Sequence, residues 1–182
     1  PIVMTKDNAT GVWSYELENY SAYKYYKYEI VNNGTTYYVC DIHAKAASPD
    51  SIAAQLVDIN AGTDYGTKEN YVNPFGNSGE TQKSYADAVI YEMHIRDWAK
   101  AFDGEGKFIE LAESEKFIAH LKEMGITHVQ VVPMFDYAQV NSDKNYNWGY
   151  NPYHYNVPEG RYVKDMKDGM DAVNQLRQFI KA

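Results

Sequence analysis

The chain has 182 residues, of which 45% are hydrophobic and 23% charged, so its length suits one ordinary domain or parts of two in a globular protein. Its formal net charge of −8 argues against nucleic acid or an anionic membrane surface as a partner. No apolar run approaches the stretch of about 18 residues that a membrane span requires.

The first 60 residues contain four runs that are typical of short strands, at residues 11–17, 25–31, 35–40 and 55–59. Asn33 and Gly34 join the second and third runs, and this dipeptide is the strongest short signal for a β-hairpin. Cys40, the only cysteine, ends the third run, where we expect a small buried residue and no internal disulfide. No spacing of Cys or His indicates a metal site, and we expect no cofactor. The pattern predicts part of an all-β sandwich over 1–60.

Residues 61–86 are polar, contain four glycines and show no hydrophobic period. We predict a linker or surface connection there. The sequence therefore divides into a strand-rich unit at 1–60, a linker at 61–86 and a third unit at 87–182.

The third unit alternates strand and helix patterns. Residues 88–95 and 127–133 are apolar runs that predict buried parallel strands. Residues 111–124 place apolar side chains at helical spacing, and Gly125 is expected to end that helix. A second helix is predicted through 173–180. The order strand, helix, strand, long loop, helix is typical of the opening of an α/β fold with parallel strands.

The predicted long loop carries the most informative pattern in the chain. Residues 146–155 read YNWGYNPYHY, which places six aromatic rings, counting His154, around Gly149 and Pro152, and VPEG follows at 157–160. Aromatic rings held on a turn form a flat apolar platform with polar tips, which suits the face of a sugar ring. The alternative is a tyrosine-rich surface loop without a ligand.

This pattern resembles the YNWGYDP…VPEG motif of type I pullulanases, which are debranching enzymes of the α-amylase superfamily. Residues 91–97 are similar to the first barrel strand of that family, and residues 125–136 to its second helix-strand junction. Residues 11–14, the hairpin and residues 41–46 look like the late strands of its β-sandwich, although Ile42 and His43 depart from the usual DPYA. The resemblance implies a partial β-sandwich related to starch-binding modules, followed by the first βα units of a (β/α)8 TIM barrel.

The resemblance also implies an activity, which is retaining hydrolysis of α-1,6-glucosidic linkages in pullulan and branched α-glucans. The catalytic Asp and Glu residues of the family lie on later strands and match no residue here. A complete barrel needs about 250 residues, and fewer than half of these follow residue 87. We therefore interpret the chain as an N-terminal fragment, inactive alone and with no catalytic residue, and we interpret Glu92 and Asp136 as structural. The alternatives are a noncatalytic α-glucan-binding module or an inactive truncated one.

One wall of a substrate site remains. Tyr150 matches the family tyrosine that stacks on the glucose ring just before the cleaved bond. Asn151 stands where the family most often has Asp, so a hydrogen-bond acceptor is kept and the charge is lost. Trp148 and Asn147 are expected to shape the turn and to contact an α-glucan. We interpret His94 as a core histidine bonded to the backbone, and we expect exposed strand edges to permit self-association.

Overall fold

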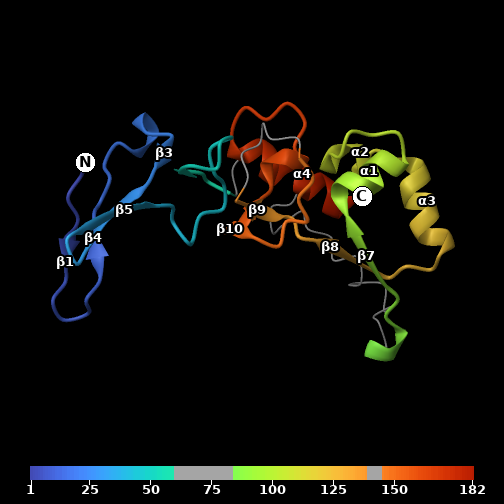
Figure 1. Ribbon diagram of the computed structural model, residues 1–182, viewed down its shortest axis with the longest axis horizontal. Helices are drawn as coiled ribbons and strands as arrows, with labels where there is room; N and C mark the ends of the chain where they lie inside the picture. The colour runs from blue at the N-terminus through green and yellow to red at the C-terminus, as the bar shows by residue number, and fades with distance from the viewer. Residues whose placement is uncertain (60–83, 139–144) are drawn as a thin grey trace.

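The computed structural model describes residues 1–59, 84–138 and 145–182, in which short strands outnumber helices (Figure 1). The strands are β1 (Thr5–Lys6), β2 (Trp13–Ser14), β3 (Tyr25–Tyr26), β4 (Tyr28–Asn32), β5 (Thr35–Val39), β6 (Ala54–Gln55), β7 (Ile90–His94), β8 (His128–Val132), β9 (Phe135–Tyr137) and β10 (Pro152–Pro158). The helices are α1 (Ile95–Ala101), α2 (Phe108–Ala112), α3 (Glu115–Glu123) and α4 (Gly169–Lys181), with 3-10 turns η1 (Tyr20–Ala22), η2 (Tyr85–Asp87) and η3 (Gly160–Tyr162). No helix in these ranges has the length and apolar character needed to cross a bilayer.

The strands of the described ranges pair two by two. The pairs β1–β2, β3–β6, β4–β5 and β9–β10 are antiparallel, whereas β7–β8 is parallel. Figure 1 shows the strands of residues 1–59 at one end of the molecule and the helices beside β7 and β8 at the other, with β9 and β10 between them. The strand-rich first part is thus present, and a sandwich or a barrel remains a prediction.

The hairpin predicted at Asn33-Gly34 is confirmed. Asn32 pairs with Thr35, and the two turn residues have φ angles of 50° and 76°, as a tight hairpin turn requires. The other predicted strands of this part are shorter than expected, because only Trp13–Ser14 and Ala54–Gln55 find partners. A strand exists only where a second strand supplies hydrogen bonds, and a run of favourable residues does not ensure one. The predicted linker lies outside the described residues up to position 83, and η2 begins near its end.

The predicted parallel pair is also confirmed, with a register that runs from Ile90 beside His128 to His94 beside Val132. Both strands were expected to be buried along their length, and this was wrong. Ile90 is 62% exposed, and each strand becomes buried only toward its C-terminal end. The physical reason is that β7 and β8 supply only Met93 to the buried residues of the main core cluster, whereas Tyr91 and Val131 are only partly buried against it.

The helix predicted over 111–124 is two helices. α2 ends at Ala112, and Ser114 starts α3 because its hydroxyl oxygen accepts the Phe117 N–H at 3.2 Å. Gly125 ends α3 as predicted: its φ is +67°, its N–H donates to the Lys122 carbonyl, and the next N–H donates to that of Leu121. The predicted last helix is confirmed as α4, whose first turn is capped by Asp168.

The long loop that was expected to carry the aromatic motif contains two strands instead. β10 pairs with β9 with irregular register, and the second half of the motif lies in β10. Alternation along β10 buries His154 and leaves Tyr153 and Tyr155 exposed. The first half of the motif therefore forms a turn, and the second half is held by main-chain pairing.

The first part of the chain is joined to the second by a close contact with the start of α4. The Gly169 N–H donates to the Gln55 side-chain oxygen at 2.7 Å, and Lys24 forms an ion pair with Asp168 at 3.1 Å. A Cβ atom added to Gly169 would lie 2.8 Å from the Cβ of Ala46 and closer still to the Ala47 carbonyl oxygen. Cys40 is half-buried beside this region, less buried than expected, and its thiol donates to the Ile52 carbonyl at 3.4 Å.

Substitution Gly169→Ala should lower the free energy of unfolding by about 2 to 3 kcal/mol, because the new methyl group meets main-chain atoms that cannot rotate away. Gly34→Ala is the matched control, since open space surrounds that residue and only its positive φ costs about 1 kcal/mol. Urea unfolding followed by circular dichroism measures both. Equal losses in the two variants would contradict the close contact at α4.

Candidate functional site

The aromatic turn depends on Gly149, which no other residue replaces without strain. Its φ is +83°, and an added Cβ would lie 3.1 Å from a ring carbon of Tyr137 and 3.2 Å from the Cδ of Pro133. The Gly149 N–H donates to the side-chain oxygen of Asn147 at 2.7 Å. The side chain of Asn147 therefore closes the turn, and Gly149 packs closely against Tyr137 of β9 and against Pro133, which follows β8.

The two large rings that flank this glycine point toward solvent. Trp148 and Tyr150 are each 65% exposed, although they are among the most apolar groups of the turn. Asn151 is also exposed, and its carbonyl oxygen accepts the Ala138 N–H at 3.0 Å, which ties the turn to the end of β9. The structure thus gathers the four predicted site residues on one short segment: Asn147 shapes it, and the other three are accessible.

His94 ends β7 and lies beneath the turn. It is buried, and its Nε2 lies 3.2 Å from the Asn147 carbonyl oxygen and 3.1 Å from the hydroxyl of Tyr162. A carbonyl oxygen only accepts, so Nε2 carries the proton that is donated to Asn147. Burial lowers the pKa of His94 below its ordinary 6.5, so the ring is neutral near pH 7. The interpretation of His94 as a core histidine bonded to the backbone is confirmed.

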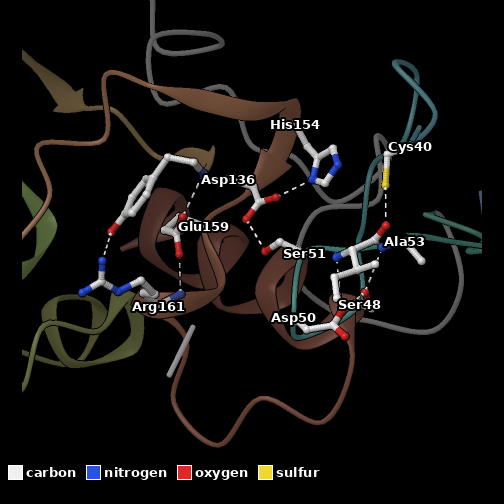
Figure 2. A network of polar contacts seen from close by, with 11 residues as sticks. Cys40, Ser48, Asp50, Ser51, Ala53, Asp136, His154, Glu159 and Arg161 are labelled. Carbon is white, nitrogen blue, oxygen red and sulfur yellow. Dashed lines mark hydrogen bonds and ion pairs between the residues drawn. The ribbon is translucent and has the colours of Figure 1, made fainter. Parts of the chain in front are cut away.

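The acidic residues near the turn have structural partners (Figure 2). Asp136, on β9, is 1% exposed and accepts hydrogen bonds from the Ser51 hydroxyl at 2.7 Å and from Nδ1 of His154. The structural interpretation of Asp136 therefore holds, and its hydrogen bonds join three segments of the chain. Glu92 is exposed and accepts from the Gln130 amide at 2.9 Å, its neighbour in the parallel register.

Glu159, in the VPEG segment, is a fully buried carboxyl group that the sequence analysis did not single out. It accepts the N–H groups of Tyr137 at 3.0 Å and Arg161 at 2.7 Å. Burial raises its pKa from 4.5 to about 7, and the nearby charge of Asp136 adds to this, while the two N–H donors act in the opposite direction. The glycine and proline beside it in the motif were the only sequence signal for a constrained position.

The contribution of Glu159 to the stability of the chain should be smaller at pH 8 than at pH 5, because Glu159 binds its proton more tightly in the folded state than in the unfolded state. Stability from this group is complete below pH 4.5 and is lost as the pH rises through about 7, up to about 3 kcal/mol. Urea unfolding at the two pH values measures the difference. Glu159→Gln should remove this contribution to the pH dependence, whereas the exposed control Glu92→Gln should leave it in place. An unchanged pH dependence in Glu159→Gln would refute the assignment.

Comparisons with known proteins come from sequence and from structure. No protein-family model matches the chain. A pullulanase of Bacillus subtilis (strain 168) is 38% identical over 52% of this chain and 15% of that protein, and a pullulanase of Klebsiella aerogenes is 27% identical over 98% of this chain and 23% of that protein. The crystal structure of a pullulanase from Anoxybacillus sp. LM18-11 complexed with maltotetraose has a TM-score of 0.78 and 30% identity, over 97% of this chain and 26% of that one.

The structure of a pullulanase from Bacillus acidopullulyticus gives a TM-score of 0.73 and 31% identity, again over 97% of this chain and 22% of that one. The chain therefore spans about a quarter or less of the proteins that it matches. The sequence comparisons and the structure comparisons both match the chain to pullulanases. The chain is pullulanase-like, and it corresponds to a part of these longer glycoside hydrolases of the α-amylase superfamily.

Proposed function

We propose that residues 147–151 form one wall of an α-glucan-binding site, in a protein that hydrolyses α-1,6-glucosidic linkages of pullulan or branched α-glucans by a retaining mechanism. The observation that carries the proposal is the rigid turn that exposes Trp148 and Tyr150 to solvent. Aromatic faces of this kind stack on the apolar faces of sugar rings. Two solved structures of the pullulanase from Anoxybacillus sp. LM18-11 are complexed with maltotetraose and with maltotriose, which supports a malto-oligosaccharide as the ligand here.

The position of the turn supports a barrel as its scaffold. We propose that 1–60 is a partial β-sandwich, 61–86 a linker and 87–182 the start of a (β/α)8 barrel. In such barrels the site lies at the C-terminal ends of the strands. His94 is the last residue of β7, and it bonds directly to the turn. An apolar groove of about 620 Å³ between α3, β8 and α4 suits the packing of further barrel elements.

The proposal separates binding from hydrolysis. Retaining hydrolysis needs a nucleophilic carboxylate and a protonated carboxyl group about 5 Å apart that both reach the sugar. Asp136 and Glu159 are buried, and Asp97 accepts the hydroxyl of Tyr146 at 2.9 Å. These groups support the protein rather than reach a substrate. We therefore propose that the 182-residue chain alone binds glucan without hydrolysing it, which is also what a noncatalytic binding module would do.

Substitution Trp148→Ala or Tyr150→Ala should weaken the binding of maltotetraose by about tenfold or more, because a stacked ring contributes on the order of 1.5 kcal/mol. Neither ring is packed in the core, so the free energy of unfolding should change by less than about 0.5 kcal/mol. Isothermal titration calorimetry measures the affinity. Trp13→Ala is the matched control, since Trp13 is 57% exposed on β2, away from the turn. Equal affinities in all variants would contradict the proposed site.

The purified, mass-verified chain should release no reducing ends from pullulan, since no described carboxyl pair near the turn is free to act on a sugar. A reducing-sugar assay with an active pullulanase as positive control measures this. Release by the chain, abolished in a chain with Glu92→Gln and Asp97→Asn, would show that its own exposed carboxylates catalyse hydrolysis and would overturn the separation of binding from catalysis.

A further inference from the structure

Tyr146 precedes the exposed pair of rings, and side chains at the start of α1 contact it in three different ways. Its ring stacks on the imidazole of His94, with centroids 5.3 Å apart and an interplanar angle of 29°. The guanidinium of Arg96 lies 5.2 Å from the centroid of the ring. The hydroxyl of Tyr146 donates to a carboxylate oxygen of Asp97 at 2.9 Å. The stacking contact, the cation–π contact and the hydrogen bond together restrict the ring of Tyr146 to one orientation.

The main chain on both sides of Tyr146 is held as well. The carbonyl oxygen of Asn145 accepts from the Arg161 guanidinium at 2.6 Å, and that of Asn147 accepts from His94 at 3.2 Å. Three consecutive residues are therefore fixed by groups from other elements. Trp148 follows directly and meets the ring of Tyr146 edge-on, with centroids 6.2 Å apart and an interplanar angle of 87°.

These contacts mainly restrict the conformation of the turn. Tyr146 is 45% exposed, and an exposed hydrogen bond or cation–π contact adds little to the stability of a whole chain. Their effect is to keep the turn in a single conformation before a ligand arrives. A ligand then does not have to immobilise the rings that it stacks on, and its affinity increases.

We infer that Tyr146 is a positioning residue for the glucan-binding turn, held by His94, Arg96 and Asp97, and that it fixes the orientation of Trp148. The identity of the ligand in this inference rests on the proposed function. The expected effect on the mobility of Trp148 rests on the structure alone. Asp97 acts through the hydroxyl of Tyr146 and does not need to contact the sugar. Burial, together with the hydrogen bond to Asp97, raises the pKa of Tyr146, so its hydroxyl stays protonated and donates across the physiological range.

The test compares Tyr146→Phe, Asp97→Ala and the double variant in a Trp13→Phe background. In this background Trp98 and Trp148 are the two remaining tryptophans. The signal of Trp98 is measured in a matched Trp148→Phe protein and subtracted, so that acrylamide quenching and fluorescence anisotropy report the mobility of Trp148. Calorimetry with maltotetraose reports affinity, and urea unfolding reports stability. Tyr37→Phe is the control, because it removes an exposed tyrosine hydroxyl from β5, far from the turn in sequence.

Each single variant should increase the quenching and mobility of Trp148 and weaken maltotetraose binding by about threefold, with an unchanged urea midpoint. The double variant should lose no more than either single one, because both remove the same hydrogen bond. Unchanged quenching in the variants would overturn the inference, even where the parent protein binds maltotetraose. Absence of binding by the parent would refute the proposed function alone, and quenching would still decide whether Tyr146 positions Trp148.

Discussion

The hydrogen bond from the buried imidazole of His94 to the carbonyl oxygen of Asn147 is the contact on which the geometry of the site depends. It joins the end of a parallel strand to the aromatic turn, and the same ring stacks on Tyr146 and meets the hydroxyl of Tyr162. Burial keeps the imidazole neutral, so the ring donates without bringing a charge into the core. Strand, helix start and turn are thereby set relative to one another by one side chain.

A second buried polar group connects the two parts of the chain. Ser51 comes from the strand-rich part, and Asp136 and His154 come from β9 and β10, so their hydrogen bonds exist only when these segments are assembled (Figure 2). Buried polar groups must be paired, and an alternative packing would leave Asp136 without partners. The chain thus uses acidic groups to specify its own assembly, and it presents aromatic rings to solvent. That division suits a surface that holds a neutral sugar.

Much of the local structure could be predicted from residue order. The turn at Asn33-Gly34, the end of a helix at Gly125, the last helix and the two separate strands near residues 90 and 130 all follow from patterns within a few residues. The segment that carries the candidate site could be located in the same way, because its rings, glycine and proline are consecutive. Such signals act within one turn or one strand, where neighbouring residues decide the backbone conformation.

The sequence by itself therefore determined the hairpin turn at Asn33-Gly34, the end of a helix at Gly125, the last helix and the segment that carries the aromatic rings. Tertiary structure alone decided that residues 152–158 form a strand, that β7 is half exposed, and that Tyr146 meets Asp97, 49 residues away. It also decided that Asp136 belongs to Ser51, 85 residues away. Strand pairing, burial and ring contacts depend on groups brought together by the whole fold, and no local pattern encodes which distant partner a side chain meets.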